Sequence, residues 1–301
     1  MTKQIKYSIF NFLRFIPDSI MLRAQYFVKL QRWCHIHTPL RFTEWIQWYK
    51  AYYRNVYMPS CTDKFLVRNF VAEQLQDDKY LNELYQVCEN AEDIDWESLP
   101  QKFVIKTTDG GNGDNIYICN DKASMNIYDV VNLINSWRYK HYENLSREWA
   151  YSGAVSSRII VEKYLEDPNS SDGSIDDYKL LCFNGKFKLL WIDKNRYSSH
   201  KRGFWDADLN FLPDVFSDHP TFDAPPELPS NIYEMICLSE KLSSNFPFVR
   251  VDWYNINGNI IFGEITFYPW SGYVKFTPDS FDYELGKYFA DAVNEFKRSM
   301  K

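Results

Sequence analysis

Two pairs of polar residues near the C-terminus have the types and the spacing needed to bind a metal ion and an anion. Arg250 and Asp252 lie two residues apart in one apolar stretch, and Glu264 and Thr266 lie two apart in the next. Residues two apart in a β-strand point to the same side, so a hairpin can place both pairs on one face. Converging carboxylates suit Mg²⁺, which binds one or two carboxylates together with substrate phosphates. The same spacing also fits a surface ladder in which the arginine pairs with the acids.

A glycine-rich loop follows Lys106, which ends a short apolar stretch. Gly110, Gly111 and Gly113 lie in this loop, and a second apolar stretch, 115–119, comes after it. Glycines let backbone N–H groups approach phosphate oxygens closely, and a lysine supplies positive charge. The loop is not a P-loop, because no Gly-Lys-Ser/Thr follows and a strand rather than a helix comes next. Taken alone, the pattern favours an ordinary tight hairpin turn.

A strand end with a carboxylate further along the chain could accommodate a nucleoside. The apolar stretch 158–165 ends in Glu162-Lys163-Tyr164-Leu165, and Asp177 opens the next stretch. Exposed backbone groups at a strand end can pair with an adenine edge, and a carboxylate can accept hydrogen bonds from ribose hydroxyls. By itself this is a weak signal.

The segment 193–211 combines many cations with a transferase-like motif. Its cations are Lys194, Arg196, His200, Lys201 and Arg202. They would suit an acidic sugar, a carboxylate or a transferring phosphoryl group. His200 is a candidate general base, although a solvated charged loop fits it better.

Asp206-Ala207-Asp208 in the same segment matches the Asp-x-Asp motif of nucleotide-sugar transferases. Matches of three residues are common by chance. The motif therefore supports only an alternative hypothesis, a glycosyltransferase that holds a metal ion on Asp206 and Asp208.

The composition is that of a folded globular protein. Of 301 residues, 45% are apolar and 25% are charged, which excludes collagen-like, low-complexity and wholly disordered chains. The six cysteines lie far apart without a Cys-x-x-Cys pair, so we expect buried reduced thiols. The chain lacks an apolar stretch of the roughly 18 residues that a spanning helix needs, and its N-terminus makes a poor signal peptide. The cytoplasm is the expected location.

Charge is unevenly distributed along the chain. Residues 1–70 hold 11 Lys/Arg and 3 Asp/Glu, whereas the other residues hold the remaining 23 and 37. A basic, aromatic N-terminal region suggests an anionic partner such as a membrane surface, a lipid phosphate or an acidic glycan. A solvated charged face over a packed helix fits equally well. A nucleic acid is disfavoured, because the whole chain is acidic and lacks the usual binding motifs.

The predicted elements run from helices to mixed strands and helices, which indicates an α+β fold with largely antiparallel sheets. Asn184-Gly185 between two apolar runs is a strong hairpin signal, and a second hairpin is expected around 255–259. Helices are predicted over 4–35, 42–57, 64–76, 124–142, 231–245 and from 281 onward.

The strand lysine with its glycine loop, the hinge at 162–165 and the polar pairs of the last hairpin occur in an order that resembles the ATP-grasp superfamily. The segments RFTEWIQWYK and DYKLLCFNGK, among others, resemble its teichuronopeptide-biosynthesis (TupA-like) branch over about residues 38–275. Members of this branch are associated with bacterial cell-surface polysaccharide loci. The resemblance implies two α+β subdomains that clasp ATP. It divides the chain into a helical region 1–99, a lid 100–165 and a metal-binding subdomain 166–301.

The resemblance also implies a role for each matching residue. Lys64 and Lys106 would contact the nucleotide, and the three loop glycines would cover its phosphates. The adenine pocket would be lined by Glu162, Lys163 and Leu165, and Asp177 would meet the ribose. Arg250 would face a developing acyl phosphate, and Mg²⁺ would be held by Asp252, Glu264 and Thr266. Lys106, Arg250, Arg202 and His200 form the predicted catalytic set.

Two positions depart from the pattern of the superfamily. Thr266 stands where ATP-grasp ligases usually carry asparagine, which weakens a second metal site. The loop lacks the histidine that relatives often place after the strand lysine, and Asp109 or Asp114 would repel phosphates.

The activity that the resemblance implies is that of an ATP-dependent carboxylate–amine ligase. The substrates would be ATP, a carboxylate such as a uronic acid of a surface-glycan precursor, and an amine or amino acid. The alternatives are the glycosyltransferase, a non-catalytic nucleotide- or glycan-binding protein, and a kinase that stops at the phosphorylated product.

Overall fold

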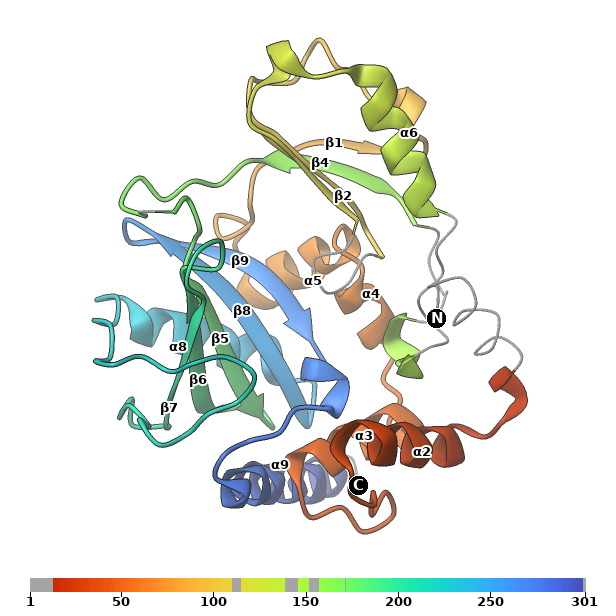
Figure 1. Ribbon diagram of the computed structural model, residues 1–301, viewed down its shortest axis with the longest axis vertical. Coiled ribbons are helices and arrows are strands. Elements are labelled where there is room, and N and C mark those ends of the chain that lie inside the picture. The colour runs from red at the N-terminus through yellow and green to blue at the C-terminus, as the bar shows by residue number, and fades with distance from the viewer. Residues whose placement is uncertain (1–12, 110–114, 139–145, 152–156, 171, 300–301) are drawn as a thin grey trace.

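The computed structural model describes residues 13–109, 115–138, 146–151, 157–170 and 172–299. Two antiparallel sheets and the helices that cover them make up this part of the chain, which confirms the predicted α+β class. In Figure 1 the four-stranded sheet lies at the top, the five-stranded sheet lies below it, and a layer of helices forms the base. None of the helices in the described ranges has the length and apolarity to cross a membrane.

The N-terminal helices differ in their bounds from the predicted ones. A 3-10 turn, η1 (Leu13–Phe15), precedes α2 (Asp18–Leu30), because Pro17 ends one element and caps the next. The rest of the predicted helix 4–35 lies partly outside the described residues. Further helices are α3 (Phe42–Tyr52), α4 (Met58–Thr62) and α5 (Leu66–Leu75). The predicted helix 42–57 is thus interrupted after Tyr52.

The four-stranded sheet has the order β1-β4-β2-β3. Its strands are β1 (Leu84–Cys88), β2 (Phe103–Thr107), β3 (Ile116–Cys119) and β4 (Ile159–Lys163). One face packs on α6 (Ile127–Arg138) through Phe103, Ile105 and Val161. Sequence reasoning missed β1, which pairs with β4. The predicted boundary at residue 100 therefore cuts this sheet, which we call the lid.

The five-stranded sheet has the order β7-β6-β5-β8-β9. Its strands are β5 (Asp177–Phe183), β6 (Lys186–Lys194), β7 (Lys201–Trp205), β8 (Phe248–Ile256) and β9 (Asn259–Thr266). Both predicted hairpins form. Asn184 and Gly185 have φ 49° and 73°, the left-handed turn that this dipeptide favours.

Helices cover one face and one end of the five-stranded sheet. On α8 (Ile232–Ser243), Ser239 accepts a 2.7 Å hydrogen bond from the buried Trp253 indole of β8. At the end of the sheet, Phe289 of α9 (Asp279–Ser299) packs on Phe42 and Phe248. The strand residues that alternate with this apolar face carry the charged side chains described next.

Candidate functional site

The last hairpin places its two polar pairs on one face, as their spacing predicts. Asp252 lies opposite Glu264, and Arg250 lies opposite Thr266. The Arg250 guanidinium donates to both oxygens of Asp252 at 2.6 Å, to Glu264 at 2.7 Å and to the Thr266 hydroxyl at 3.0 Å. The Asp252 side chain is buried, whereas that of Glu264 is 54% exposed. Glu264 is therefore the carboxylate of this pair that solvent or a ligand can reach.

Burial and ion pairing act in opposite directions on these acids. Partial desolvation by the surrounding side chains would raise the pKa of the half-exposed Glu264, but Arg250 and Lys179 outweigh it and lower this pKa to about 2. For Asp252 burial prevails over the same two cations, with help from the nearby carboxylates of Glu264 and Asp177, and raises the pKa to about 6. Glu264 is thus anionic at neutral pH, and Asp252 is the acid of the pair that titrates nearest to neutrality.

The face of the sheet that carries Arg250, Asp252, Glu264 and Thr266, called here the charged face, continues onto β5. Sequence reasoning missed Lys179 of this strand. Lys179 lies opposite Asp252 and donates to it at 2.8 Å, and it also donates to Asp177. Arg196 also donates to the Asp177 carboxylate, at 3.1 Å. Asp177 is therefore a buried member of the charged face, held by two cations. Its predicted contact with ribose stays a prediction.

Asp193 and Arg202 extend the face to β6 and β7. They pair across the two strands, and Arg202 donates to both oxygens of Asp193 at 2.6 and 3.2 Å and also to Asp218. His200 contacts Asp193 at 3.0 Å and lies against His219 with ring centroids 3.7 Å apart. Burial would raise the pKa of Asp193, but Arg202 outweighs it and lowers that pKa.

The predicted cationic patch is largely neutralised by neighbouring acids. The ion pairs are Lys194–Asp176, Arg196–Asp177, Lys201–Asp223, Arg202–Asp193 and Arg202–Asp218. An acidic substrate at this edge must compete with these carboxylates. Arg196, with 45% of its side chain exposed, is the most accessible of these cations.

Two stacked tryptophans lie against the arginines of the charged face. Trp191 of β6 stacks on Trp270 with ring centroids 4.1 Å apart, and the Arg250 guanidinium lies 4.9 Å from the Trp191 ring. Trp270 and Ser271 belong to the turn η5 (Pro269–Gly272) and have φ of 51° and 57°. Left-handed backbone is strained in residues other than glycine, so the surroundings must hold this turn in place.

Lys50 and Gln47 of α3 hold that turn. The fully buried Lys50 ammonium donates to the Ser271 carbonyl at 2.8 Å and to its hydroxyl at 2.5 Å, and it lies 3.3 Å from Glu148. Gln47 donates to the carbonyls of Ser271 and Gly272 at 3.0 and 3.1 Å. Burial lowers the pKa of Lys50 to about 8 although Glu148 opposes the shift. Helix α3 thus positions the segment that follows Glu264 and Thr266.

The lid contributes a smaller charged cluster on the face away from α6. Lys106 of β2 lies 2.8 Å from Glu162 of β4, which also lies 3.4 Å from Arg68 of α5. The Lys106 side chain is 26% exposed. The Glu162 carboxylate therefore faces Lys106 and Arg68. The predicted phosphate-covering residues Gly110, Gly111 and Gly113 lie outside the described residues.

Lys64 joins the lid cluster to the hairpin cluster. Its backbone N–H donates to the carbonyl of Thr108, just after β2, at 3.0 Å. Burial lowers the pKa of Lys64, and the charges that act on it belong to both clusters: Glu264 on one side, and Lys106, Asp109 and Glu162 on the other. Lys64 therefore lies within electrostatic range of both clusters, and its backbone is bonded to the lid.

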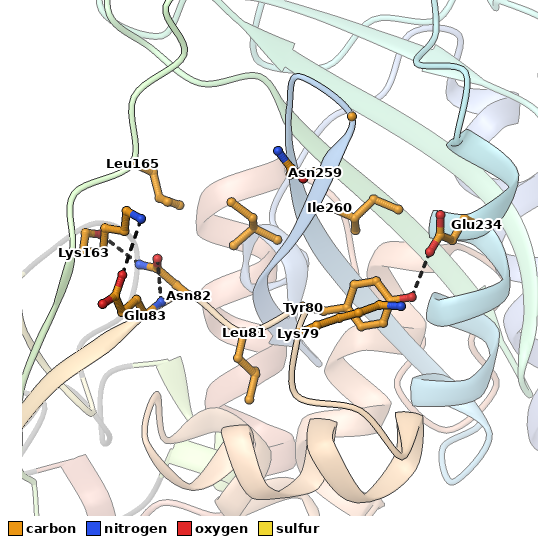
Figure 2. A pocket seen from close by; sticks show the side chains of 12 residues that line it. Lys79, Tyr80, Leu81, Asn82, Glu83, Lys163, Leu165, Glu234, Asn259 and Ile260 are labelled. Atoms are coloured by element: carbon orange, nitrogen blue, oxygen red, sulfur yellow. Dashed lines mark hydrogen bonds and ion pairs between the residues drawn. The ribbon is translucent and has the colours of Figure 1, made fainter.

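A cavity of about 510 Å³ lies at the hinge between the two sheets. Lys163 and Leu165 line it from the lid, and Ile260 and Ile261 line it from β9 (Figure 2). The Lys163 backbone is already bonded, since its N–H donates to Glu83 and its carbonyl accepts from Asn82, both at 2.9 Å. The predicted contact of Lys163 and Leu165 with an adenine edge stays a prediction. Sequence reasoning missed the isoleucines, which carry no polar signal.

The oxygen donors of the last hairpin fit a magnesium ion that arrives with phosphates. Asp252, Glu264 and Thr266 offer only oxygen atoms on one face, the donor type that Mg²⁺ prefers. Arg250 and Lys179 already engage both oxygens of Asp252. Within the described ranges no three His, Cys, Asp or Glu side chains converge to form a metal cage. The site thus suits an ion shared with a ligand better than a permanent protein-bound ion.

Asp206 of the Asp-x-Asp motif forms an ordinary turn. Its carboxylate accepts hydrogen bonds from the backbone N–H groups of Asp208 and Asn210, both at 2.9 Å, and from the Asn210 amide at 3.1 Å. These bonds account for the spacing of the motif without a metal ion. All six cysteines are free, and five of them are buried as expected, whereas Cys237 is exposed.

Comparison with known proteins identifies the family. A profile described as TupA-like ATPgrasp matches residues 44–290. No curated protein matches the chain. A D-alanine–D-alanine ligase from Bacillus anthracis is similar over 80% of this chain and 70% of its own, at 15% identity and a TM-score of 0.49. An L-amino acid ligase from Bacillus licheniformis is similar over 76% and 49%, at 12% identity and a TM-score of 0.46, so this chain spans about half of it.

The two largely antiparallel sheets agree with the ATP-grasp architecture that the resemblance implies. The profile covers most of the chain, including most of α3, both sheets and the first half of α9. The chain belongs to the TupA-like ATP-grasp family.

Proposed function

We propose that the protein is an ATP-dependent carboxylate–amine ligase. ATP transfers its terminal phosphoryl group to a substrate carboxylate, which gives an acyl phosphate and ADP. The amine then attacks the acyl carbon, phosphate leaves, and the amine gives up a proton as the amide forms. The observation that carries this proposal is the polar face of the last hairpin, where Arg250 bonds Asp252, Glu264 and Thr266, because it places an anion-binding cation beside carboxylates suited to Mg²⁺.

The residues of the two clusters have distinct tasks in this proposal. Lys106 and Lys64 bind phosphate oxygens, and Arg250 stabilises negative charge on the transferring group. Magnesium, held by Asp252 and Glu264, would neutralise phosphate charge. His200, which contacts Asp193 at 3.0 Å, is the candidate to accept the proton of the amine. Burial of Asp252 and Arg250 keeps their orientation fixed before substrate arrives.

The proposed carboxylate is a uronic acid or another acid of a bacterial surface-polysaccharide precursor, such as one for capsule or O-antigen, and the amine is an amino acid or a simple amine. The resemblance to a branch associated with such loci supports this choice. The cations Arg196 and Arg202 at the edge of the charged face support an acidic substrate, which would displace their present carboxylate partners. We propose a cytoplasmic location, at the inner face of the membrane where the acceptor is lipid-linked.

ADP release separates this activity from its alternatives. The protein is incubated with Mg-ATP and a panel of uronic acids, nucleotide-sugars and amino acids, and ADP, phosphate and the mass of any conjugate are measured. A ligase yields ADP, phosphate and a product lighter than its two substrates by one water. A kinase yields ADP and a phosphorylated product, and a glycosyltransferase releases nucleotide from a nucleotide-sugar without ATP.

A matched pair of variants tests the assignment of the site. Asp252→Asn removes a charge from the buried cluster, and Asp206→Asn removes one from the exposed turn. We expect Asp252→Asn to lower ADP release at least about 100-fold and Asp206→Asn to leave it nearly unchanged. The reverse pattern would support the glycosyltransferase. Full ADP release by Asp252→Asn would show that the hairpin is not the reaction site.

A further inference from the structure

Trp270 lies on the charged face and is carried there by a strained turn. Its indole stacks on the buried Trp191, and the Arg202 guanidinium lies 5.4 Å from its ring. Trp270 and Ser271 both have left-handed backbone, although neither is a glycine. Residues other than glycine keep this conformation only where their surroundings enforce it, and such positions are concentrated at ligand sites. The turn η5 thus makes Trp270 a candidate for contact with a ligand.

The Trp270 indole N–H and the Tyr151 hydroxyl have unused hydrogen-bonding capacity. Neither group forms a hydrogen bond within the ranges that the structure describes, and neither belongs to the fully buried polar atoms. Both side chains are partly exposed. An indole N–H or a phenol hydroxyl normally has a partner where water is excluded. These two groups are therefore open to water or to a ligand.

Tyr151 lies near the last hairpin. It ends the turn η4 (Trp149–Tyr151), in the connection from α6 to β4, and its ring centroid lies 6.3 Å from that of Tyr268. Burial raises the pKa of Tyr151, Glu264 adds to this shift, and Arg250 opposes it. Tyr151 is therefore within electrostatic range of the charged groups of the hairpin.

Lys50 holds these two segments together. Its buried ammonium lies 3.3 Å from Glu148, three residues before Tyr151. The same ammonium donates at 2.8 Å to the carbonyl of Ser271, which follows Trp270. The segments of Tyr151 and Trp270 are thus fixed side by side through one buried cation.

The position of Trp270 along the chain separates it from the hinge cavity. Ile260 and Ile261 at the start of β9 line that cavity, Glu264 lies further along the strand, and Trp270 follows the strand end. Figure 1 shows η5 (blue) after the arrowhead of β9, away from the tip of the β8–β9 hairpin. A nucleotide that reaches from the hinge to Glu264 therefore leaves the Trp270 end of the charged face to the second substrate.

We propose that Trp270 and Tyr151 form a subsite for the ring of a sugar acid, a carbohydrate that carries a carboxylate. A sugar ring offers hydroxyls to the indole N–H and to the phenol, and C–H groups to the aromatic rings. Its carboxylate is directed toward Arg250, because a guanidinium binds carboxylates well. An acid without a ring fills only the Arg250 end. This subsite rests on the proposed function, since it takes the carboxylate substrate of that reaction.

Binding of two sugar acids to the full chain tests the subsite. Glucuronate, which forms a ring, and gluconate, which is an open chain, are titrated with and without Mg²⁺ and a non-hydrolysable ATP analogue, and saturation-transfer NMR gives their dissociation constants. The test variants are Tyr151→Phe, which removes one hydroxyl, and Trp270→Phe, which removes the indole N–H. The controls are Tyr233→Phe and Trp33→Phe, at two side chains that are each 69% exposed elsewhere. Thermal unfolding verifies that all four variants remain folded.

We expect glucuronate to bind more tightly than gluconate, and each test variant to weaken glucuronate binding about threefold or more, because a hydrogen bond is lost. Both controls should bind like the natural protein. Absence of glucuronate binding, unchanged binding by both test variants, or an equal loss for gluconate would overturn the subsite.

ADP release with the full panel of substrates is measured separately. Glucuronate binding that depends on Tyr151 and Trp270 without any ADP release would contradict the ligase activity and leave the subsite in place. ADP release with glucuronate that neither test variant alters would contradict the subsite and leave the ligase activity in place.

Discussion

The five-stranded sheet and the lid differ in how far their charged side chains are buried and paired. On the five-stranded sheet Asp177, Asp193 and Asp252 are each at most 3% exposed. Asp177 and Asp252 each contact two cationic side chains, and Asp193 contacts Arg202 and the imidazole of His200. On the lid Lys106 remains 26% exposed and has Glu162 as its partner. The charged side chains of the five-stranded sheet are therefore held in place before any ligand binds, whereas the lid keeps the Lys106 ammonium accessible.

This difference has an energetic reason. A buried charge without a partner is costly, so the five-stranded sheet must balance its charges internally. A partly exposed lysine can exchange its carboxylate for solvent or for a phosphate at little cost. We therefore expect the charges of the five-stranded sheet to contribute mainly to stability and those of the lid mainly to ligand binding. Variants of charged residues in the two sheets should separate these two properties.

The largest difference in stability is expected between a variant that removes a cation from the five-stranded sheet and one that removes a cation beside the lid. Arg250→Ala leaves Asp252 and Glu264 without their shared partner and should lower the free energy of unfolding by about 3–5 kcal/mol. Arg68→Ala should cost about 1 kcal/mol, because Glu162 retains Lys106 at 2.8 Å. Urea unfolding of both variants measures the difference. Equal losses would mean that the two regions are not distinct in the way described.

A second test concerns the support behind the five-stranded sheet. The pKa of Lys50, about 8, lies below its ordinary value of 10.5, so the unfolded chain keeps this proton to higher pH than the folded protein does. Relative to Lys50→Met, the natural protein should therefore gain stability as the pH rises from about 8 to 10.5, by about 3 kcal/mol. Urea unfolding at several pH values checks the sign. A constant difference between the two proteins would show that Lys50 stays charged, held by Glu148.

The sequence predicts local features of this site better than long-range ones. The polar pairs of the last hairpin share a face because a hairpin places neighbouring stretches side by side. Lys179 was missed because its role depends on the pairing of β5 with β8, which lies about 70 residues further along the chain. The same holds for Lys50, whose contact with Ser271 joins α3 to a turn 221 residues away. Strand β1 was missed for a similar reason, since its partner β4 is distant.

A smaller effect should follow from changes to the accessible cation of the lid. Lys106→Met should weaken binding of ATP about tenfold or more, because a charge-assisted contact to phosphate is lost. Lys102→Met is the matched control, since Lys102 precedes the same strand and pairs with the exposed Glu166. Calorimetric titration without the other substrates compares them. If Lys102→Met weakened ATP binding as much as Lys106→Met, the effect would be one of overall charge.

The smallest effect distinguishes the hinge cavity from the charged clusters. Leu165→Ala should weaken ATP binding about threefold, because the side chain offers apolar contact to a purine, yet leave tripolyphosphate binding unchanged. Leu133→Ala, which changes an exposed leucine on α6 of the same lid, is the control for folding. Lys106→Met, by contrast, should weaken both ligands. If Leu165→Ala and Lys106→Met affect ATP and tripolyphosphate alike, the base does not bind in the hinge cavity. A loss confined to ATP in Leu165→Ala places the base between Leu165 and Ile261, with the phosphates directed toward Lys106.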